Sequence, residues 1–350
     1  MSSNIKSKTS FQPLSIDVND KSSKLRKGKE NGIDYAQKKY TSVWGQRWNY
    51  KLILIWIHGL AIFVHASLAV VGTIVYVYTP VVNTPILLHL VDYGQASGTT
   101  FYTQLNASVI AQYPVFLGGF MVEWITLLAH MCYLWNILWN DEIPTKGHWQ
   151  RWVEYGITAT LMSFNAQLSI GMNDLYVLVV CVGHGVALQP LGYLIEQLPR
   201  DDSTKSTRMR KVFGNMYGFI GFFINFPTVA LYIIHSNLSA NTPSSFNENI
   251  AFFFVYFNLF GLNSTLYNAK MGAWVDFRWV ECMYNVLSLV TKTATFVIPF
   301  ATYRGLAEAT GVTTKVGVNW DVVRYVLGDT IPLVVLILFI VVFLPSTRKR

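Results

Sequence analysis

The sequence predicts an all-α membrane protein: a seven-helix bundle with its N-terminus inside the cell, followed by an eighth transmembrane helix. Hydrophobic residues make up 52% of the 350-residue chain and charged residues only 13%, about half of the roughly 25% found in soluble domains. Runs of about 20 apolar residues, the length of a membrane-spanning helix, recur along the chain between polar segments. The three cysteines, Cys132, Cys181 and Cys282, all fall within such runs, so we expect no disulfide.

The first 45 residues are rich in Lys, Ser and Asn, with neither the apolar core of a signal peptide nor a helical period. We expect residues 1–45 to form a disordered, basic cytoplasmic tail and residues 46–304 to form the seven-helix domain. The eight expected spans lie near 51–78, 114–139, 149–170, 174–197, 211–235, 249–268, 278–303 and 322–345.

Two further segments have their own patterns. Residues 79–113 alternate apolar and polar side chains in their middle part, which is typical of a β-hairpin, here in an extracellular loop. Residues 305–350 are expected to contain an extracellular linker, the eighth helix and a basic tail. Arg324 and Asp329 interrupt the first half of that helix, but Ile331–Leu344 is the most continuously apolar stretch of the chain. The eighth helix therefore either spans the bilayer or lies partly across it.

Basic residues indicate the orientation, because cytoplasmic segments of membrane proteins are enriched in Lys and Arg. With the N-terminus inside, the cytoplasmic segments carry 23 Lys and Arg, whereas the outside segments carry only Arg304, Lys315 and Arg324. The glycosylation sequons at Asn106 and Asn237 then both lie outside. We expect a multi-pass integral membrane protein with both termini in the cytoplasm.

Lys292 lies in the middle of the seventh span, 14 residues beyond Arg278, or about 21 Å along a helix. An ionised group at this depth costs about 2.5–3.5 kcal/mol, so it needs a partner or a function. Lys292 can pair with a buried carboxylate or bind an anion. Because a desolvated amine is nucleophilic, it can also form a Schiff base with an aldehyde ligand.

Other spans supply polar partners for this lysine, in pairs four residues apart on one helix face. These pairs are Glu154 and Thr158, Thr126 and His130, and Ser288 and Lys292 itself. The first span adds His58 and His65, seven residues apart on one face. The convergence of these groups predicts a polar site inside the bundle.

Glu123 lies seven residues before His130, on the same helix face and nearer to the outside. We expect Glu123 to face water or to pair near the outer surface. The alternative is that it extends a proton path.

Two of these segments resemble motifs of a known family. Tyr284-Asn-Val-Leu-Ser-Leu-Val-Thr-Lys292 and Arg151-Trp-Val-Glu-Tyr155 are similar to the retinal-lysine and counterion motifs of the heliorhodopsins. The resemblance extends over residues 45–304 and implies a retinal-binding seven-helix bundle with the inverted orientation that the charges indicate. It implies that Lys292 carries all-trans retinal as a protonated Schiff base, with Glu154 as its counterion.

The resemblance also implies roles for the residues around this pair. Ser288 would donate a hydrogen bond to Glu154, and His65 and His130 would belong to a polar cavity beside the Schiff base. The implied cofactor-binding residues are Lys292, Glu154, Ser288, Thr158, Thr126, His65, His130 and Trp152. Arg151 and Glu196, at the cytoplasmic ends of their helices, resemble the inner polar cluster of the family. Separately from the resemblance, Glu123, Arg151 and Glu196 are candidates for a proton path. The eighth span and the long basic tail lie outside the usual seven-helix plan.

These observations favour a retinal photoreceptor with a long-lived signalling state that neither pumps ions nor acts as an enzyme. The first alternative is a light-gated passive proton channel. The second is a retinal-free membrane protein with a structural Lys292–Glu154 pair. Expected partners are membrane lipids, a second copy of the chain in a homodimer and a cytoplasmic signalling protein, and nucleic acid is not expected. The sequence has no metal-ligand spacing, phosphate-binding glycine loop or serine-hydrolase motif.

Overall fold

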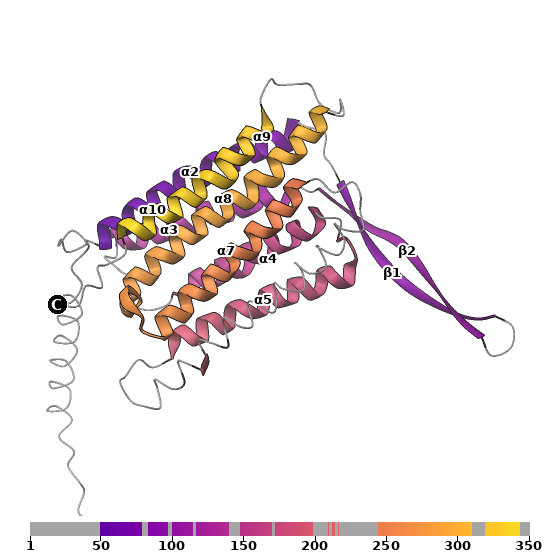
Figure 1. Ribbon diagram of the computed structural model, residues 1–350, viewed down its shortest axis with the longest axis horizontal. Helices are drawn as coiled ribbons and strands as arrows, with labels where there is room; N and C mark the ends of the chain where they lie inside the picture. Colours follow the sequence, from indigo (N-terminus) through magenta and orange to yellow (C-terminus); the bar gives the residue numbers. More distant parts are fainter. Residues whose placement is uncertain are drawn as a thin grey trace, which may run out of the picture.

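The computed structural model describes most of the predicted spans. The described residues are 50–78, 83–96, 100–114, 117–139, 148–169, 172–198, 244–309 and 319–343, with 209, 212, 213 and 216 as single residues. In this part of the chain, long helices run side by side and a two-stranded hairpin projects from one end of the bundle (Figure 1). The predicted tail over 1–45 lies outside the described residues, as does the fifth span near 211–235 apart from three single positions.

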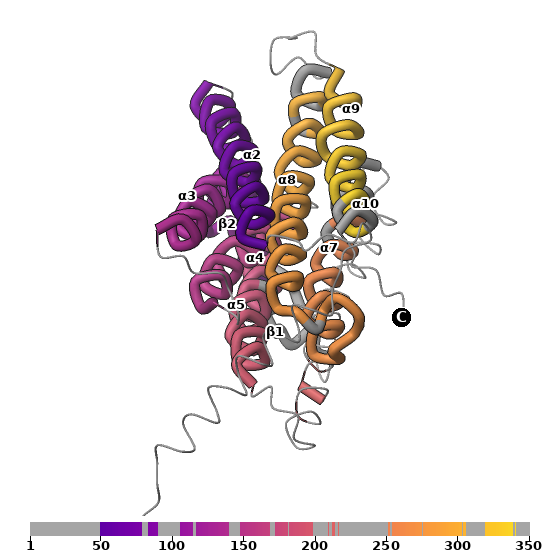
Figure 2. The backbone as a smooth tube through the Cα atoms, turned by 90° about the vertical axis from the view of Figure 1, so that its left-hand side faces the viewer, coloured from indigo at the N-terminus to yellow at the C-terminus, as the bar shows by residue number. Residues whose placement is uncertain are grey.

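Six long helices form the bundle in the described residues. They are α2 (Tyr50–Tyr78), α3 (Leu117–Trp139), α4 (Trp149–Ser169), α5 (Leu175–Gln197), α7 (Ser244–Asn268) and α8 (Phe277–Ala309). Helix α2 contacts both α3 and α8, α3 contacts α4, α4 contacts α5, and α7 contacts α8. The helices therefore follow one another around the bundle (Figure 2). Within the described residues, α2, α3 and α5 are each long and apolar enough to cross a membrane.

Local signals set the ends of these helices. Asp174 caps α5 by accepting hydrogen bonds from two backbone amides. Helix α7 ends where Lys270 adopts a φ of 53°, and the Met271 amide donates back to the Leu266 carbonyl at 3.1 Å, which is the Schellman pattern of helix ends. The short 3-10 helix η1 (Gly272–Val275) then leads into α8.

The hairpin is present and extends beyond the middle part of residues 79–113, where the alternating pattern predicts it. Its antiparallel strands are β1 (Asn83–Ala96) and β2 (Thr100–Pro114). Several hydrogen bonds attach it to the residues just before α5. The Asn173 side-chain amide donates to the Pro85 carbonyl at 2.9 Å. The Leu87 amide donates to the Asn173 carbonyl at 2.9 Å, and His89 Nδ1 lies 2.5 Å from Asp174 Oδ2.

A helix occupies the region where the eighth span was expected, and it consists of three consecutive segments. They are α9 (Trp320–Val323), the π-helix η2 (Arg324–Thr330) and α10 (Ile331–Phe343). In an α-helix, the amide at position 332 would donate to the Gly328 carbonyl. Residue 332 is a proline and has no amide hydrogen. The Ile331 amide instead donates five residues back, to the Val326 carbonyl, which is the π-helical pattern.

Helix α8 is the core element of the bundle. It contacts α2, α3, α4, α7 and the eighth helix, and nearly all its side chains between Phe277 and Ala301 are buried. The segment that carries Lys292 is therefore surrounded by protein, as a site inside the bundle requires.

Candidate functional site

Lys292 and Glu154 form a buried ion pair between α8 and α4. The Lys292 ammonium donates to Glu154 Oε1, and the two side chains are only 4% and 7% exposed. The same carboxylate oxygen accepts hydrogen bonds from Thr158 at 3.1 Å and from Thr126 at 3.4 Å. Because a buried charge is costly unless it is paired and hydrogen-bonded, these contacts explain how Glu154 is tolerated here.

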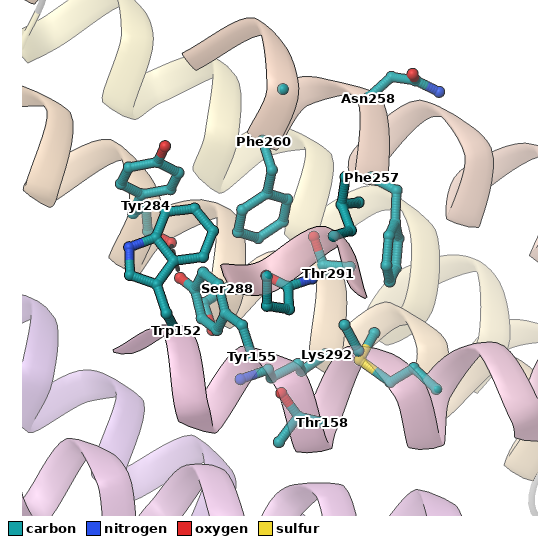
Figure 3. A pocket seen from close by; sticks show the side chains of 15 residues that line it. Trp152, Tyr155, Thr158, Phe257, Asn258, Phe260, Tyr284, Ser288, Thr291 and Lys292 are labelled. Atoms are coloured by element: carbon teal, nitrogen blue, oxygen red, sulfur yellow. Dashed lines mark hydrogen bonds between the residues drawn. The ribbon is translucent and has the colours of Figure 1, made fainter. Parts of the chain in front are cut away.

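An aromatic pocket opens beside the lysine. It encloses about 650 Å³ of empty space, a volume that includes the open solvent at its mouth. Aromatic rings of α4, α7 and α8 line part of its walls, and Figure 3 shows Lys292 running along the pocket beside Tyr155 and Thr158. These rings are Trp152, Tyr155, Phe257, Phe260 and Tyr284.

Ser288 and Thr291 add hydroxyl groups to the pocket wall, one turn and one residue before Lys292. Ser288 is 2% exposed and lies in the predicted place. Among the described residues, however, the hydroxyls that donate to Glu154 are those of Thr126 and Thr158, not that of Ser288.

A second buried charge cluster lies next to Trp152. The Arg151 guanidinium donates to Glu196 Oε2 at 2.7 Å and also to Glu281, and the indole of Trp152 donates to Glu196 at 2.9 Å. The guanidinium carbon lies 4.4 Å from the Tyr284 ring centroid. The predicted inner cluster of Arg151 and Glu196 is therefore brought together in the described residues.

Sequence reasoning missed Glu281 as a member of this cluster. The residue is 6% exposed and lies eleven positions before Lys292, with Asn285 and Ser288 between them at helical spacing. Because three helical turns separate positions eleven residues apart, Glu281, Asn285, Ser288 and Lys292 share one face of α8. That spacing was the signal by which Glu281 could have been found.

The histidines form a buried chain between α2 and α3. His58 Nδ1 and His130 Nδ1 lie 2.8 Å apart, so one ring donates and the other accepts. The rings of His65 and His130 are stacked, with centroids 5.6 Å apart. His65 Nδ1 in turn lies 2.5 Å from Glu123 Oε2.

Glu123 was expected to face water or to pair near the outer surface; it does not face water, and it does have a partner. Its side chain is 0% exposed and its partner is His65, which is also 0% exposed. The pairing across two helices explains the difference, because the imidazole supplies a partner that the α3 sequence alone does not reveal.

In the comparison with known protein families, a family model described as Heliorhodopsin matches residues 54–302. The match includes every residue of the two charge clusters and of the histidine chain. The chain belongs to the heliorhodopsin family. No curated protein matches it.

The pocket of this heliorhodopsin fits the retinal that its family implies. A buried primary amine lies at the pocket wall, a carboxylate contacts that amine, and aromatic rings line the space beside it. Lys292 can form the covalent link, Glu154 can balance a positive charge there, and the rings of Tyr155 and Phe260 can pack against a polyene. The protein is thus a rhodopsin-type membrane protein, and its family implies a retinal chromophore.

The family match ends before the eighth helix. It stops at residue 302, whereas the C-terminal segments continue over 320–343. This heliorhodopsin therefore carries a helix beyond the matched region.

Proposed function

We propose that this heliorhodopsin is a light receptor that holds all-trans retinal on Lys292 as a protonated Schiff base, with Glu154 as counterion. The observation that supports this proposal is the Lys292–Glu154 pair, which is buried at the wall of the aromatic pocket. Bound retinal supplies light absorption and a change of shape. The chain supplies the attachment, the balancing charge and the walls.

Glu154 is held in place to act on that charge. Thr158 lies one turn further along α4 and Thr126 on α3, and both hydroxyls donate to the oxygen that contacts Lys292. In a low-dielectric pocket a fixed carboxylate stabilises a neighbouring positive charge strongly, because little water screens it.

The other buried carboxylates support a receptor without active pumping. A pump needs proton-exchanging groups on both sides of the chromophore and a switch between them. Glu196 and Glu281 both pair with Arg151, so one guanidinium holds both carboxylates, and the three groups when ionised carry one excess negative charge. We propose that the light state instead acts through a cytoplasmic signalling protein, with the receptor in a homodimer and surrounded by lipid.

An absorption spectrum tests the receptor proposal. Purified protein mixed with all-trans retinal should develop a visible band that bleaches or shifts on illumination and recovers in the dark. A protein that binds no retinal would support the alternative of a structural Lys292–Glu154 pair.

A second candidate function is light-gated passive proton conduction, which the buried histidine chain favours. Protonatable groups follow one another from His58 through His130 and His65 to Glu123, and His65 Nε2 and Glu123 Oε1 have no hydrogen-bond partner in the described residues. Water can bridge such atoms and complete a path.

Voltage clamp under illumination tests this function: a current that reverses near the proton equilibrium potential and is weakened by Glu123→Gln would establish it. A current independent of the pH gradient would exclude it.

A further inference from the structure

The helix beyond the family match packs along the helix that carries the retinal lysine. Residues 320–343, here called the C-terminal helix, contact α8 through each of their three segments, and Figures 1 and 2 show the two running side by side. We propose that the C-terminal helix responds to displacement of α8 and carries the light signal toward the cytoplasmic end of the receptor. The inference rests on the proposed receptor function and adds the element that transmits its output.

The two helices approach each other closely at Gly328. A Cβ atom added there would lie 2.7 Å from Ile298 Cγ1 and 3.6 Å from the Ile298 backbone nitrogen. Small residues let helix backbones approach closely inside membranes. A larger side chain at this position would therefore push the C-terminal helix away from α8.

Contacts on both sides of Gly328 fix the position of the C-terminal helix. Toward its start, Trp320 packs edge-on against Phe300, with ring centroids 5.7 Å apart, and the Arg304 guanidinium carbon lies 5.5 Å from the centroid of the same indole. Toward its end, Leu336 is only 5% exposed and belongs to the core cluster that contains Ile298. The interface thus extends for several turns along the second half of α8.

The interface and the retinal lysine lie on different faces of α8. Ala294 and Ile298 belong to the same core cluster as Leu336 and lie two and six residues beyond Lys292. At about 100° per residue, both point roughly 120–160° away from the lysine. A ligand attached to Lys292 therefore displaces the C-terminal helix by moving α8, not by touching it.

Such a contact is sensitive to small displacements. Helices in lipid gain little from the hydrophobic effect when they associate, so their contact depends on close packing. A shift of α8 at the Gly328 crossing would loosen that packing and change the balance between two positions of the C-terminal helix. The crossing lies within the π-helix η2, a conformation that is frequently found at functional sites.

A wedge at the crossing tests the proposal in the full-length protein with retinal bound. Gly328→Leu should leave the dark absorption band in place, because the substitution is on the far side of α8 from Lys292. It should slow the decay of the light state at least fivefold, because it removes packing that favours the dark arrangement. Gly183→Leu in α5 is the matched control, since a Cβ there would meet no atom of the described residues within 4 Å, and its decay should equal that of the unsubstituted protein.

The outcomes separate this inference from the proposed function. A normal band with unchanged or faster decay in Gly328→Leu would overturn the inference alone, whereas the absence of any band in the unsubstituted protein would overturn the receptor function. If Gly328→Leu does not accumulate, nitroxide labels on Cys132 and on Leu338→Cys, both exposed positions, give a direct measurement. A light-induced change in the distance between the labels supports the inference, and an unchanged distance overturns it.

Discussion

Replacing Glu154 with Gln is expected to lower, by about three units, the pH at which the retinal-loaded protein loses its visible band. The carboxylate contacts the Lys292 amine directly and is 7% exposed, so water screens the pair weakly. Two unit charges about 4 Å apart at an effective dielectric constant near 20 attract by about 4 kcal/mol. At about 1.36 kcal/mol per pH unit, losing that attraction moves the transition by about three units.

A glutamine isolates this charge effect because its carbonyl can still accept from Thr126 and Thr158. The assay is a spectrophotometric pH titration of the purified pigment. Glu123→Gln is the matched control: it removes another fully buried carboxylate, but one that pairs with His65, so its transition should move by much less than that of Glu154→Gln. An unchanged transition in Glu154→Gln, or an equal shift in the control, would refute the assignment of Glu154 as counterion.

Three further predictions concern topology, transport and the hairpin. With 23 basic residues on the expected cytoplasmic side, epitopes at both termini should be hidden from antibody on intact cells; labelling of the C-terminus alone would mean that the eighth helix does not span. Illuminated cells in weak buffer should show no uncoupler-sensitive pH change, and a sustained change would contradict the absence of pumping. Burial acts to raise the pKa of Asp174, but the His89 imidazole and two backbone amides outweigh it and hold the pKa below its ordinary value. Because a lowered carboxyl pKa stabilises the fold above about pH 4 and the effect is lost as the pH falls further, acid should loosen the hairpin. Asp174→Asn should abolish that pH dependence of its proteolysis, and an unchanged profile would exclude the contact as its cause.

Much of the fold could be predicted because bilayer-spanning helices have a strong hydropathy signal. Helix α2 occupies 50–78 where a span near 51–78 was expected, and the eighth helix occupies 320–343 where 322–345 was expected. Helix ends were less predictable. Helix α8 continues to Ala309, six residues beyond the expected end, because hydropathy does not register a helix that extends past the apolar region.

The candidate site was predictable where groups recur at helical spacing. Lys292, Glu154 and Thr126 were expected to converge, and they do so in the structure. The partner of Glu123 was not predictable, because His65 lies on another helix and its proximity depends on how α2 and α3 pack. The crossing of Gly328 and Ile298 depends in the same way on tertiary packing, which no local pattern reveals.

The most direct test of the central claim is the absorption spectrum of lysine variants reconstituted with all-trans retinal. Lys292→Arg keeps a positive charge beside Glu154 and so avoids an unpaired buried carboxylate, but it has no primary amine to form the link. Lys270→Ala, in the turn after α7, serves as the control. We predict a visible band in the unsubstituted protein and in Lys270→Ala, and none in Lys292→Arg or Lys292→Ala. A visible band retained in either Lys292 variant would contradict the account.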